Sequence, residues 1–226
     1  MKLLVNGCSH TAGAEILEQW HPKCPEQAWG QHLTDHFKFS EYVNLAQSGA
    51  SNQWIHDTTI KFLEECSNPS EWFVVIGWTN ACRVPVYCYE KNEVVHLCPD
   101  HRNLSYYSKG VQDAYKHLYR TMPPLLMMIA HEHYRIVSTQ MLLKQLGVQY
   151  LFFDAVSSNH ANMPTTLIDQ TRYYRYDQLM ETYWNYFQQN VWDLSNRWQN
   201  HAPASYHKEW AGHLIKFIEE NKLIDY

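Results

Sequence analysis

Short apolar runs alternate along the chain with longer segments whose apolar residues recur at helical spacing. The apolar runs predict strands at residues 3–5, 42–43, 72–76 and 148–153. The run at residues 72–76 is apolar throughout, so we expect both faces of its strand to be covered, as in a parallel sheet. The helical spacing predicts helices at residues 27–37, 51–66, 110–120, 124–146, 176–198 and 204–221.

This alternation of strands and helices predicts an α/β fold. We expect a three-layer α/β/α sandwich with a mainly parallel, flavodoxin-like sheet, formed by a single domain over residues 1–226. Residues 83–98 interrupt the alternation with two strand-like runs, 84–89 and 93–97, and therefore predict a β-hairpin insert. In sheets of this kind ligands bind at the carboxyl ends of the strands, so the residues that follow the strands are the first candidates for function.

The composition is that of a globular protein without a polyanionic partner. Apolar residues make up 45% and charged residues 18% of the 226 positions, which supplies a core and excludes disorder as the main state. The net charge is −5, so the molecule as a whole lacks a basic surface and we expect no nucleic-acid partner. Aromatic residues reach 15%, which favours packing and leaves a sugar- or base-stacking surface as the alternative.

Neither a metal site nor a cofactor site is predicted. The cysteines at positions 8, 24, 66, 82, 88 and 98 form no C-x-x-C pair and no zinc-finger spacing with histidine. His131 and His133 are two positions apart, and residues at that spacing do not share a helix face. The glycines Gly7 and Gly13 match neither a phosphate-binding nor a dinucleotide-binding fingerprint.

Membrane and secretion signals are not predicted either. The apolar run that follows Met1 turns polar at Asn6, which makes it too short for a signal peptide. No run approaches the roughly 18 apolar residues that span a bilayer. We therefore expect a cytoplasmic protein with free thiols and no membrane contact.

Chemically useful residues follow the predicted strands in order. Ser9 follows the first strand, within the sequence Gly-Cys-Ser-His-Thr-Ala-Gly. Gly49 and Asn80 follow the second and third strands, and His201 precedes the last helix. A serine hydroxyl attacks a carbonyl only when a neighbouring base takes its proton, and fixed hydrogen-bond donors then stabilise the resulting oxyanion. The residues at these four positions are therefore the first to inspect for such groups.

These ordered blocks resemble those of the SGNH (GDSL-like) hydrolases. That family has a nucleophilic serine after the first strand, a glycine after the second, an asparagine after the third and an Asp-x-x-His block before the last helix. The resemblance covers nearly the whole chain, from Ser9 to His201, and the Gly-Cys-Ser-His-Thr form of the first block is similar to a divergent phage and bacterial branch. It implies serine esterase or deacylase activity without a cofactor.

The resemblance also implies a role for each block. Ser9 is the nucleophile, and the Ser9 N–H, the Gly49 N–H and the Asn80 side-chain amide form the oxyanion hole. The implied substrate is a small-molecule or glycan ester, such as an acylated glycan, which the aromatic content suits. Arg83 follows the third block and is placed to bind a substrate carboxylate or phosphate, with an ordinary surface ion pair as the alternative.

Two histidines near the C-terminus compete for the role of general base. With His201 in the loop before the last helix, the apolar residues of that helix form one stripe: Trp210, Ala211, Leu214, Ile215 and Ile218. With His207 as the base, Lys216 and Glu220 would fall where the buried stripe belongs. We predict His201 as the base and His207 as the residue that starts the helix, with His207 as the alternative base.

Other polar residues near the blocks are assigned structural roles. His10 follows Ser9 directly, and neighbours in an extended loop point apart, so we do not expect His10 to act in the site. Cys8 is an alternative nucleophile, but a thiolate needs an electropositive surrounding and the register favours Ser9. Asn52 is expected to form hydrogen bonds at the start of a helix.

The triad carboxylate of the family has no match at its usual place. The residues three and two positions before His201 are Trp198 and Gln199. Because a carboxylate orients the imidazole and stabilises its charged form, its absence predicts a Ser–His dyad unless Asp154 or Asp193 substitutes in space. The alternative is a catalytically degenerate scaffold that binds a ligand, or one that assembles through the aromatic segment at residues 176–198.

Overall fold

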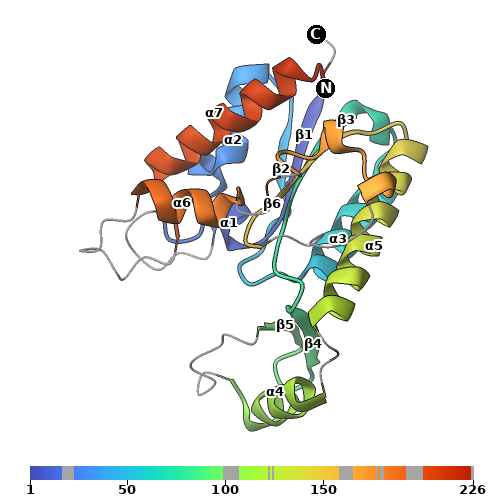
Figure 1. Cartoon of the computed structure of the whole chain (residues 1–226), viewed down its shortest axis with the longest axis vertical. Coiled ribbons are helices and arrows are strands. Elements are labelled where there is room, and N and C mark those ends of the chain that lie inside the picture. Colours follow the sequence, from blue (N-terminus) through green and yellow to red (C-terminus); the bar gives the residue numbers. More distant parts are fainter. Residues whose placement is uncertain are drawn as a thin grey trace.

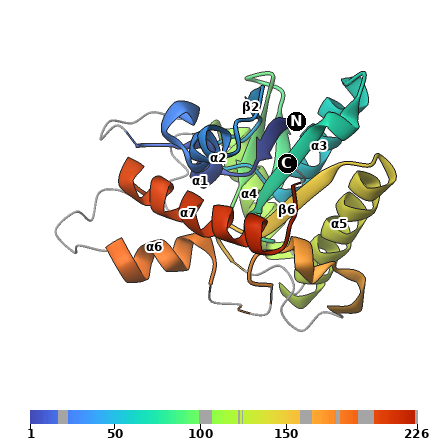
Figure 2. The same cartoon turned by 90° about the horizontal axis from the view of Figure 1, so that it is seen from above.

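The computed structural model describes residues 1–16, 23–98, 107–121, 123, 125–157, 165–176, 178, 181–191 and 201–224. In this part of the chain a parallel sheet lies between two layers of helices (Figures 1 and 2). The predicted α/β/α sandwich is therefore confirmed. None of the described helices is long and apolar enough to cross a bilayer.

The central sheet has four parallel strands in the order β2, β1, β3, β6. Their bounds are Tyr42–Asn44, Lys2–Asn6, Trp72–Trp78 and Gln149–Asp154. This order places the first strand inside the sheet, as in flavodoxin-like folds. The β3 strand is buried along its whole length, which agrees with its uninterrupted apolar sequence.

Each face of the sheet has its own helical layer and its own core. The helices α2 (Trp29–Phe37) and α7 (Ala204–Glu220) cover one face, and α3 (Asn52–Glu65) and α5 (Leu125–Gln145) cover the other (Figure 2). Because successive side chains of a strand point to opposite faces, Leu3 lies in the α2/α7 core and Leu4 in the α3/α5 core.

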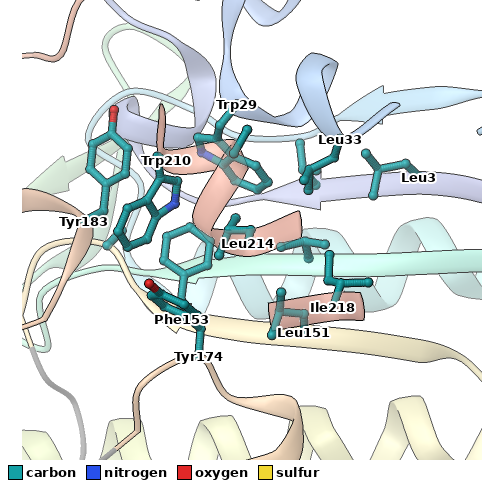
Figure 3. Close-up of a cluster of buried hydrophobic side chains, with 14 of the residues drawn as sticks. Leu3, Trp29, Leu33, Leu151, Phe153, Tyr174, Tyr183, Trp210, Leu214 and Ile218 are labelled. Carbon is teal, nitrogen blue, oxygen red and sulfur yellow. The ribbon is translucent and has the colours of Figure 1, made fainter. Parts of the chain in front are cut away.

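The α2/α7 core is built largely from aromatic rings. Trp29 of α2 and Trp210 of α7 both pack against Phe153 of β6, each with its ring centre 5.5 Å from that of Phe153 (Figure 3). Leu214 and Ile218 continue the buried stripe of α7, as the helical spacing predicts. This packing holds α7, and with it the loop that precedes α7, against the sheet.

A small subdomain is inserted after β3. The strands β4 (Val84–Cys88) and β5 (Glu93–Leu97) pair antiparallel, and α4 (Lys109–Thr121) follows them. The subdomain has its own apolar cluster, which includes Cys88, Val95, Leu97 and Val111. In Figure 1 it lies beyond the carboxyl ends of the central strands, where the polar blocks of the sequence also emerge.

The predicted helix at residues 176–198 starts later than expected. The helix α6 covers Tyr183–Val191, and residues 192–198 lie outside the described chain. Ahead of the predicted range, Tyr173 forms a parallel bridge with Phe152 of β6, and its neighbour Tyr174 donates its N–H to the Phe152 carbonyl at 2.8 Å. Tyr173 and Tyr174 enter opposite cores, which is the alternation of a strand and not of a helix.

Candidate active site

A cleft of about 490 Å³ opens at the carboxyl ends of the strands. Its lining residues come from the loops after β1, β2, β3, β5 and β6, from α6 and from the loop before α7: Ser9, His10, Ser48, Gly49, Asn80, Arg83, Cys98, Val156, Trp184 and His201. All of the site residues predicted from the sequence are in this set. The fold therefore brings together side chains that are widely separated along the chain.

Ser9 begins a single helical turn directly after β1. This turn, α1 (Ser9–Ala12), ends at Gly13, which has φ 71° and donates its N–H to the Ser9 carbonyl. A Cβ at position 13 would lie 2.5 Å from the Cys24 carbonyl oxygen, so only glycine fits there. The neighbouring Cys8 is fully buried in the α2/α7 core, and it does not line the cleft.

The loops after β1 and β2 are tied together by backbone hydrogen bonds. The Gln47 N–H donates to the Gly7 carbonyl at 3.2 Å, which holds the segment around Gly49 close to the segment around Ser9. Gly49 has φ 80°, in the left-handed region that side-chain-bearing residues rarely adopt. A residue other than glycine would therefore strain the turn that carries the predicted oxyanion donor.

Asn80 is oriented by the loop after β3. Its Oδ1 accepts the Cys82 N–H at 2.7 Å, which leaves the Nδ2 as the donor end of the amide. Asn52, in contrast, is buried and binds Thr79 twice: its Oδ1 accepts the Thr79 N–H at 2.7 Å and its Nδ2 donates to the Thr79 carbonyl at 3.1 Å. The expected structural role of Asn52 is confirmed, and it fixes the strand end from which Asn80 emerges.

His201 has a carboxylate partner that the sequence analysis did not find. Its Nδ1 lies 2.7 Å from Oε2 of Glu15, which follows the Ser9 turn at the other end of the chain. Glu15 has φ 60°, a left-handed conformation that is unusual for a residue with a side chain. Such conformations persist where the surrounding structure holds them, and they cluster at functional sites.

This pair has the electrostatics of a base and its orienting acid. The hydrogen bond from His201 holds the pKa of the Glu15 carboxyl below its usual value, against the opposing effect of partial burial. Glu15 is therefore ionised at neutral pH. Because the carboxylate accepts the proton on Nδ1, the Nε2 of His201 is the ring nitrogen left to exchange protons.

Asp154, one of the two carboxylates proposed from the sequence, does not take this place. Asp154 ends β6, and its Oδ1 accepts a hydrogen bond from the buried Tyr173 hydroxyl at 2.9 Å. Asp193 lies outside the described residues, as do Trp198 and Gln199. No feature of the sequence points to Glu15, because it lies 186 positions from His201 and not just before it.

His207 belongs to the core and not to the cleft. It lies in the first turn of α7, where its Nδ1 accepts the Trp29 N–H at 3.3 Å and its Nε2 lies 3.2 Å from the Tyr183 hydroxyl. Burial, together with the positive charges of nearby histidines, lowers the pKa of His207 to about 3. A ring held neutral in the core stabilises the start of α7 instead of exchanging protons with a substrate.

His10 does enter the cleft, contrary to the sequence expectation. Residues 9–12 are helical and not extended, so successive side chains turn by about 100° and need not point apart. The His10 ring centre lies 5.2 Å from that of His201 and 5.3 Å from that of Trp184. Burial, and to a lesser extent the neighbouring positive charges, lower the pKa of His10 well below its usual value, so its ring is neutral.

Arg83 lies where the inserted hairpin leaves the sheet. Its Nη1 donates to the Ala50 carbonyl at 3.3 Å, and its Nε is buried without a hydrogen-bond partner. Within the described ranges no carboxylate forms an ion pair with it, so the alternative of a surface ion pair is not seen there. The guanidinium is a cation at the edge of the cleft.

Most of the aromatic residues around α6 are buried. Trp184 lines the cleft beside His10, whereas four tyrosines of this region are packed in the two cores: Tyr173, Tyr174, Tyr176 and Tyr183. Packing is therefore the main role of this aromatic segment. Among the described residues, no group of three or more His, Cys, Asp or Glu side chains is placed to hold a metal ion.

Solved structures of similar shape include esterases. The chain is similar to TesA, with a TM-score of 0.50, 13% identity and coverage of 98% of this chain and 99% of TesA. It is also similar to the esterase EstA from Pseudoalteromonas sp. (TM-score 0.48, 12% identity, 97% and 98% coverage). A third structure is described as a lipolytic protein of the G-D-S-L family from Desulfitobacterium hafniense (TM-score 0.46, 12% identity, 96% and 98% coverage). At this identity the likeness to TesA establishes the fold and no more.

Sequence comparison places the chain in one family. No curated protein matches the sequence significantly. The model of a family of unknown function, DUF6071, matches residues 18–180, a segment that begins after Glu15 and ends before His201. Because this segment is more than half of the 226 residues, the chain belongs to the family DUF6071.

Proposed function

We propose that this protein is a serine ester hydrolase in which Ser9, His201 and Glu15 form the catalytic triad. The observation that carries the proposal is the 2.7 Å contact between His201 Nδ1 and Glu15 Oε2 at a cleft that Ser9 and His201 also line. A hydroxyl, an imidazole and an orienting carboxylate are recognised as a triad by their geometry and not by their order in the sequence.

In the first half of the proposed reaction, the Ser9 Oγ attacks the ester carbonyl while His201 Nε2 takes its proton. The negative charge that develops on the carbonyl oxygen is stabilised by the Ser9 N–H, the Gly49 N–H and Asn80 Nδ2. The intermediate then collapses to an acyl-serine, and His201 donates its proton to the departing alcohol. Glu15 keeps the ring in position and stabilises its protonated form throughout.

The second half repeats these steps with water. His201 takes a proton from the water as it attacks the acyl-serine, and then returns that proton to the Ser9 Oγ. The acid is released and the free serine is restored. A cleft of about 490 Å³ is within the size range of small-ligand sites, which suits a small ester or one acyl group of a glycan.

The alternative of a degenerate scaffold loses the observation that favoured it. That reading rested on the absence of a triad carboxylate, and Glu15 now stands at His201 Nδ1. The fold is shared with TesA at a TM-score of 0.50. With a carboxylate at His201, hydrolysis of an ester is the reaction to test.

The test is intact-mass analysis after incubation with a fluorophosphonate, which reacts with an activated serine. We expect one adduct on the wild type, none on Ser9→Ala, and an undiminished adduct on Ser138→Ala, because Ser138 is exposed on α5 and does not line the cleft. The variants that form the adduct should hydrolyse p-nitrophenyl hexanoate, and Ser9→Ala should not. No adduct under conditions that label a control hydrolase, or equal labelling of Ser9→Ala, would falsify the proposal.

A further inference from the structure

Arg83 carries a positive charge that the described protein leaves unbalanced. A guanidinium has five N–H donors, and the hydrogen bond to the Ala50 carbonyl uses one of them. The Nε has no partner although it is buried, and burying an unsatisfied donor is costly. An arrangement of this kind is stabilised when a ligand supplies the missing acceptor.

The cleft extends from the layer of α7 to the layer of α3. His201 precedes Ala202, which is buried in the α2/α7 core. Arg83 is bound to Ala50, which is buried in the α3/α5 core on the other face of the sheet. Both side chains line the cleft, so it has a His201 end and an Arg83 end.

No described carboxylate forms an ion pair with Arg83: Glu132, which lines a neighbouring pocket with it, is paired with Arg135 at 3.0 Å. The described residues that line the cleft include no Asp or Glu. His96 from the inserted hairpin accepts the Ser51 N–H on its Nδ1, next to Ala50. Burial and the charge of Arg83 lower the pKa of His96 to about 4, so this histidine is neutral and adds no charge of its own.

We propose that the cleft takes esters whose acyl part carries a carboxylate that binds Arg83. This inference rests on the proposed function, because His201 must protonate the departing alcohol and therefore fixes the alcohol at its own end of the cleft. The acyl part then extends toward Arg83. One guanidinium balances one negative charge and matches the two oxygens of a carboxylate, which favours a dicarboxylic monoester as substrate.

The experiment compares three p-nitrophenyl esters with acyl chains of equal length. They are the monoester of adipic acid, which is anionic, hexanoate, which is neutral, and 6-aminohexanoate, which is cationic. For the wild type we expect kcat/KM to fall in that order. This comparison needs no variant and so does not depend on how a substitution at position 83 folds.

Substitution of Arg83 then tests whether this residue causes the preference for the anionic ester. The ratio of kcat/KM for the adipate ester over the hexanoate ester should fall about 10- to 100-fold in Arg83→Met, since a hydrogen bond to a charged group has that value. Arg83→Lys should give an intermediate ratio, because it keeps the charge and loses the planar fork. Arg120→Met is the matched control, since Arg120 is exposed on α4 of the same subdomain and does not line the cleft.

The outcomes separate this inference from the proposed function. Hydrolysis of hexanoate that depends on Ser9, with the same ester preference in wild type and Arg83→Met, overturns the role of Arg83 and leaves the hydrolase intact. If the wild type does not hydrolyse the adipate ester with a higher kcat/KM than the hexanoate ester, the role of Arg83 is likewise overturned and the hydrolase is unaffected. Absence of both the fluorophosphonate adduct and Ser9-dependent turnover overturns the hydrolase, and the inference with it.

Discussion

The basic side chains at the two ends of the cleft differ in whether a described carboxylate pairs with them. At one end, His201 is paired with Glu15 at 2.7 Å, and the pair is mostly shielded, with 18% and 23% of the side-chain surfaces exposed. At the other end, the Arg83 guanidinium donates to the Ala50 carbonyl, and no described carboxylate pairs with it. Among the described residues, the counter-charge is therefore supplied at one end of the cleft and not at the other.

This difference matches two different tasks: the His201 imidazole must be oriented, and the Arg83 guanidinium must remain available to a ligand. An imidazole has two nitrogens, and a carboxylate on one of them decides which way the other points. A guanidinium that is already paired with a protein carboxylate would have its charge balanced and few N–H donors available to bind a ligand. In this view Glu15 belongs to the chemical step and Arg83 to the choice of substrate, and the two ends should respond differently to substitution.

Removing the counter-charge at the His201 end should have the largest effect. Glu15→Gln keeps the size of the side chain but replaces the carboxylate with a neutral amide, which no longer stabilises the protonated ring. We expect kcat/KM for the neutral hexanoate ester to fall about 10²- to 10⁴-fold. The preference for adipate over hexanoate should change little, because the Arg83 end is untouched. Steady-state kinetics with both esters measures both quantities.

A second histidine–glutamate pair provides the control for this prediction. His36 Nε2 lies 2.9 Å from Glu219 Oε1 on the surface, where both side chains are more than 40% exposed. Glu219→Gln removes the same kind of charge far from the cleft and should leave kcat/KM within about 2-fold of wild type. If Glu15→Gln is as active as Glu219→Gln, Glu15 is only a surface partner of His201.

Removing the donor at Asn80 should have the next largest effect, and on the chemical step alone. Asn80→Ala deletes the Nδ2 donor, and loss of one such donor typically lowers kcat about 10²- to 10³-fold. Asn80→Asp should be at least as slow, because a carboxylate would repel the oxyanion. Asn68→Ala, on an exposed turn where Asn68 bonds Ser70 and Glu71, is the control. A change in KM with unchanged kcat would contradict the oxyanion role.

Acid should weaken the fold through two buried histidines, His207 at the start of α7 and His96 on the inserted hairpin, which is the smallest of the three effects. The folded pKa is about 3 for His207 and about 4 for His96, below the usual 6.5, so the unfolded chain binds more protons as the pH falls from about 6.5 toward 4. The free energy of unfolding should therefore fall by up to about 1 kcal/mol per pH unit for each of them. Urea unfolding between pH 7 and pH 5 measures the slope.

Single variants show how much of this slope each of the two histidines contributes. His207→Asn at the start of α7 and His96→Asn on the hairpin should each flatten the dependence of unfolding free energy on pH, although both also lower stability at pH 7. The comparison is made on the slope and not on the absolute value. An unchanged slope in both variants would show that these rings do not remain neutral in the folded protein.

Local patterns in the sequence were sufficient to predict most of the fold. The continuous apolar run of β3, the stripe of α7 and the N-cap of α3 at Ser51, whose Oγ accepts the Trp54 N–H at 3.3 Å, all appear as expected. The predicted start of the last-but-one helix at residue 176 was wrong: α6 begins at Tyr183, where Thr182 Oγ1 accepts the Asn185 N–H at 3.1 Å as an N-cap does. Tyr176, whose ring extended the helical spacing, is buried in the α3/α5 core, and spacing along the chain does not specify which core a side chain enters.

The sequence by itself determined which residues follow the strands, and therefore that Ser9, Gly49, Asn80 and Arg83 meet at one edge of the sheet, because parallel strands end at the same edge. It also placed His201 in the loop before the last helix, and the packing of α7 against the sheet brings that loop to the same cleft. Only the tertiary structure decided that Glu15 reaches His201, that His10 turns into the cleft and that Arg83 has no described carboxylate partner. Such contacts depend on the path of each loop in space, which spacing along the chain does not specify.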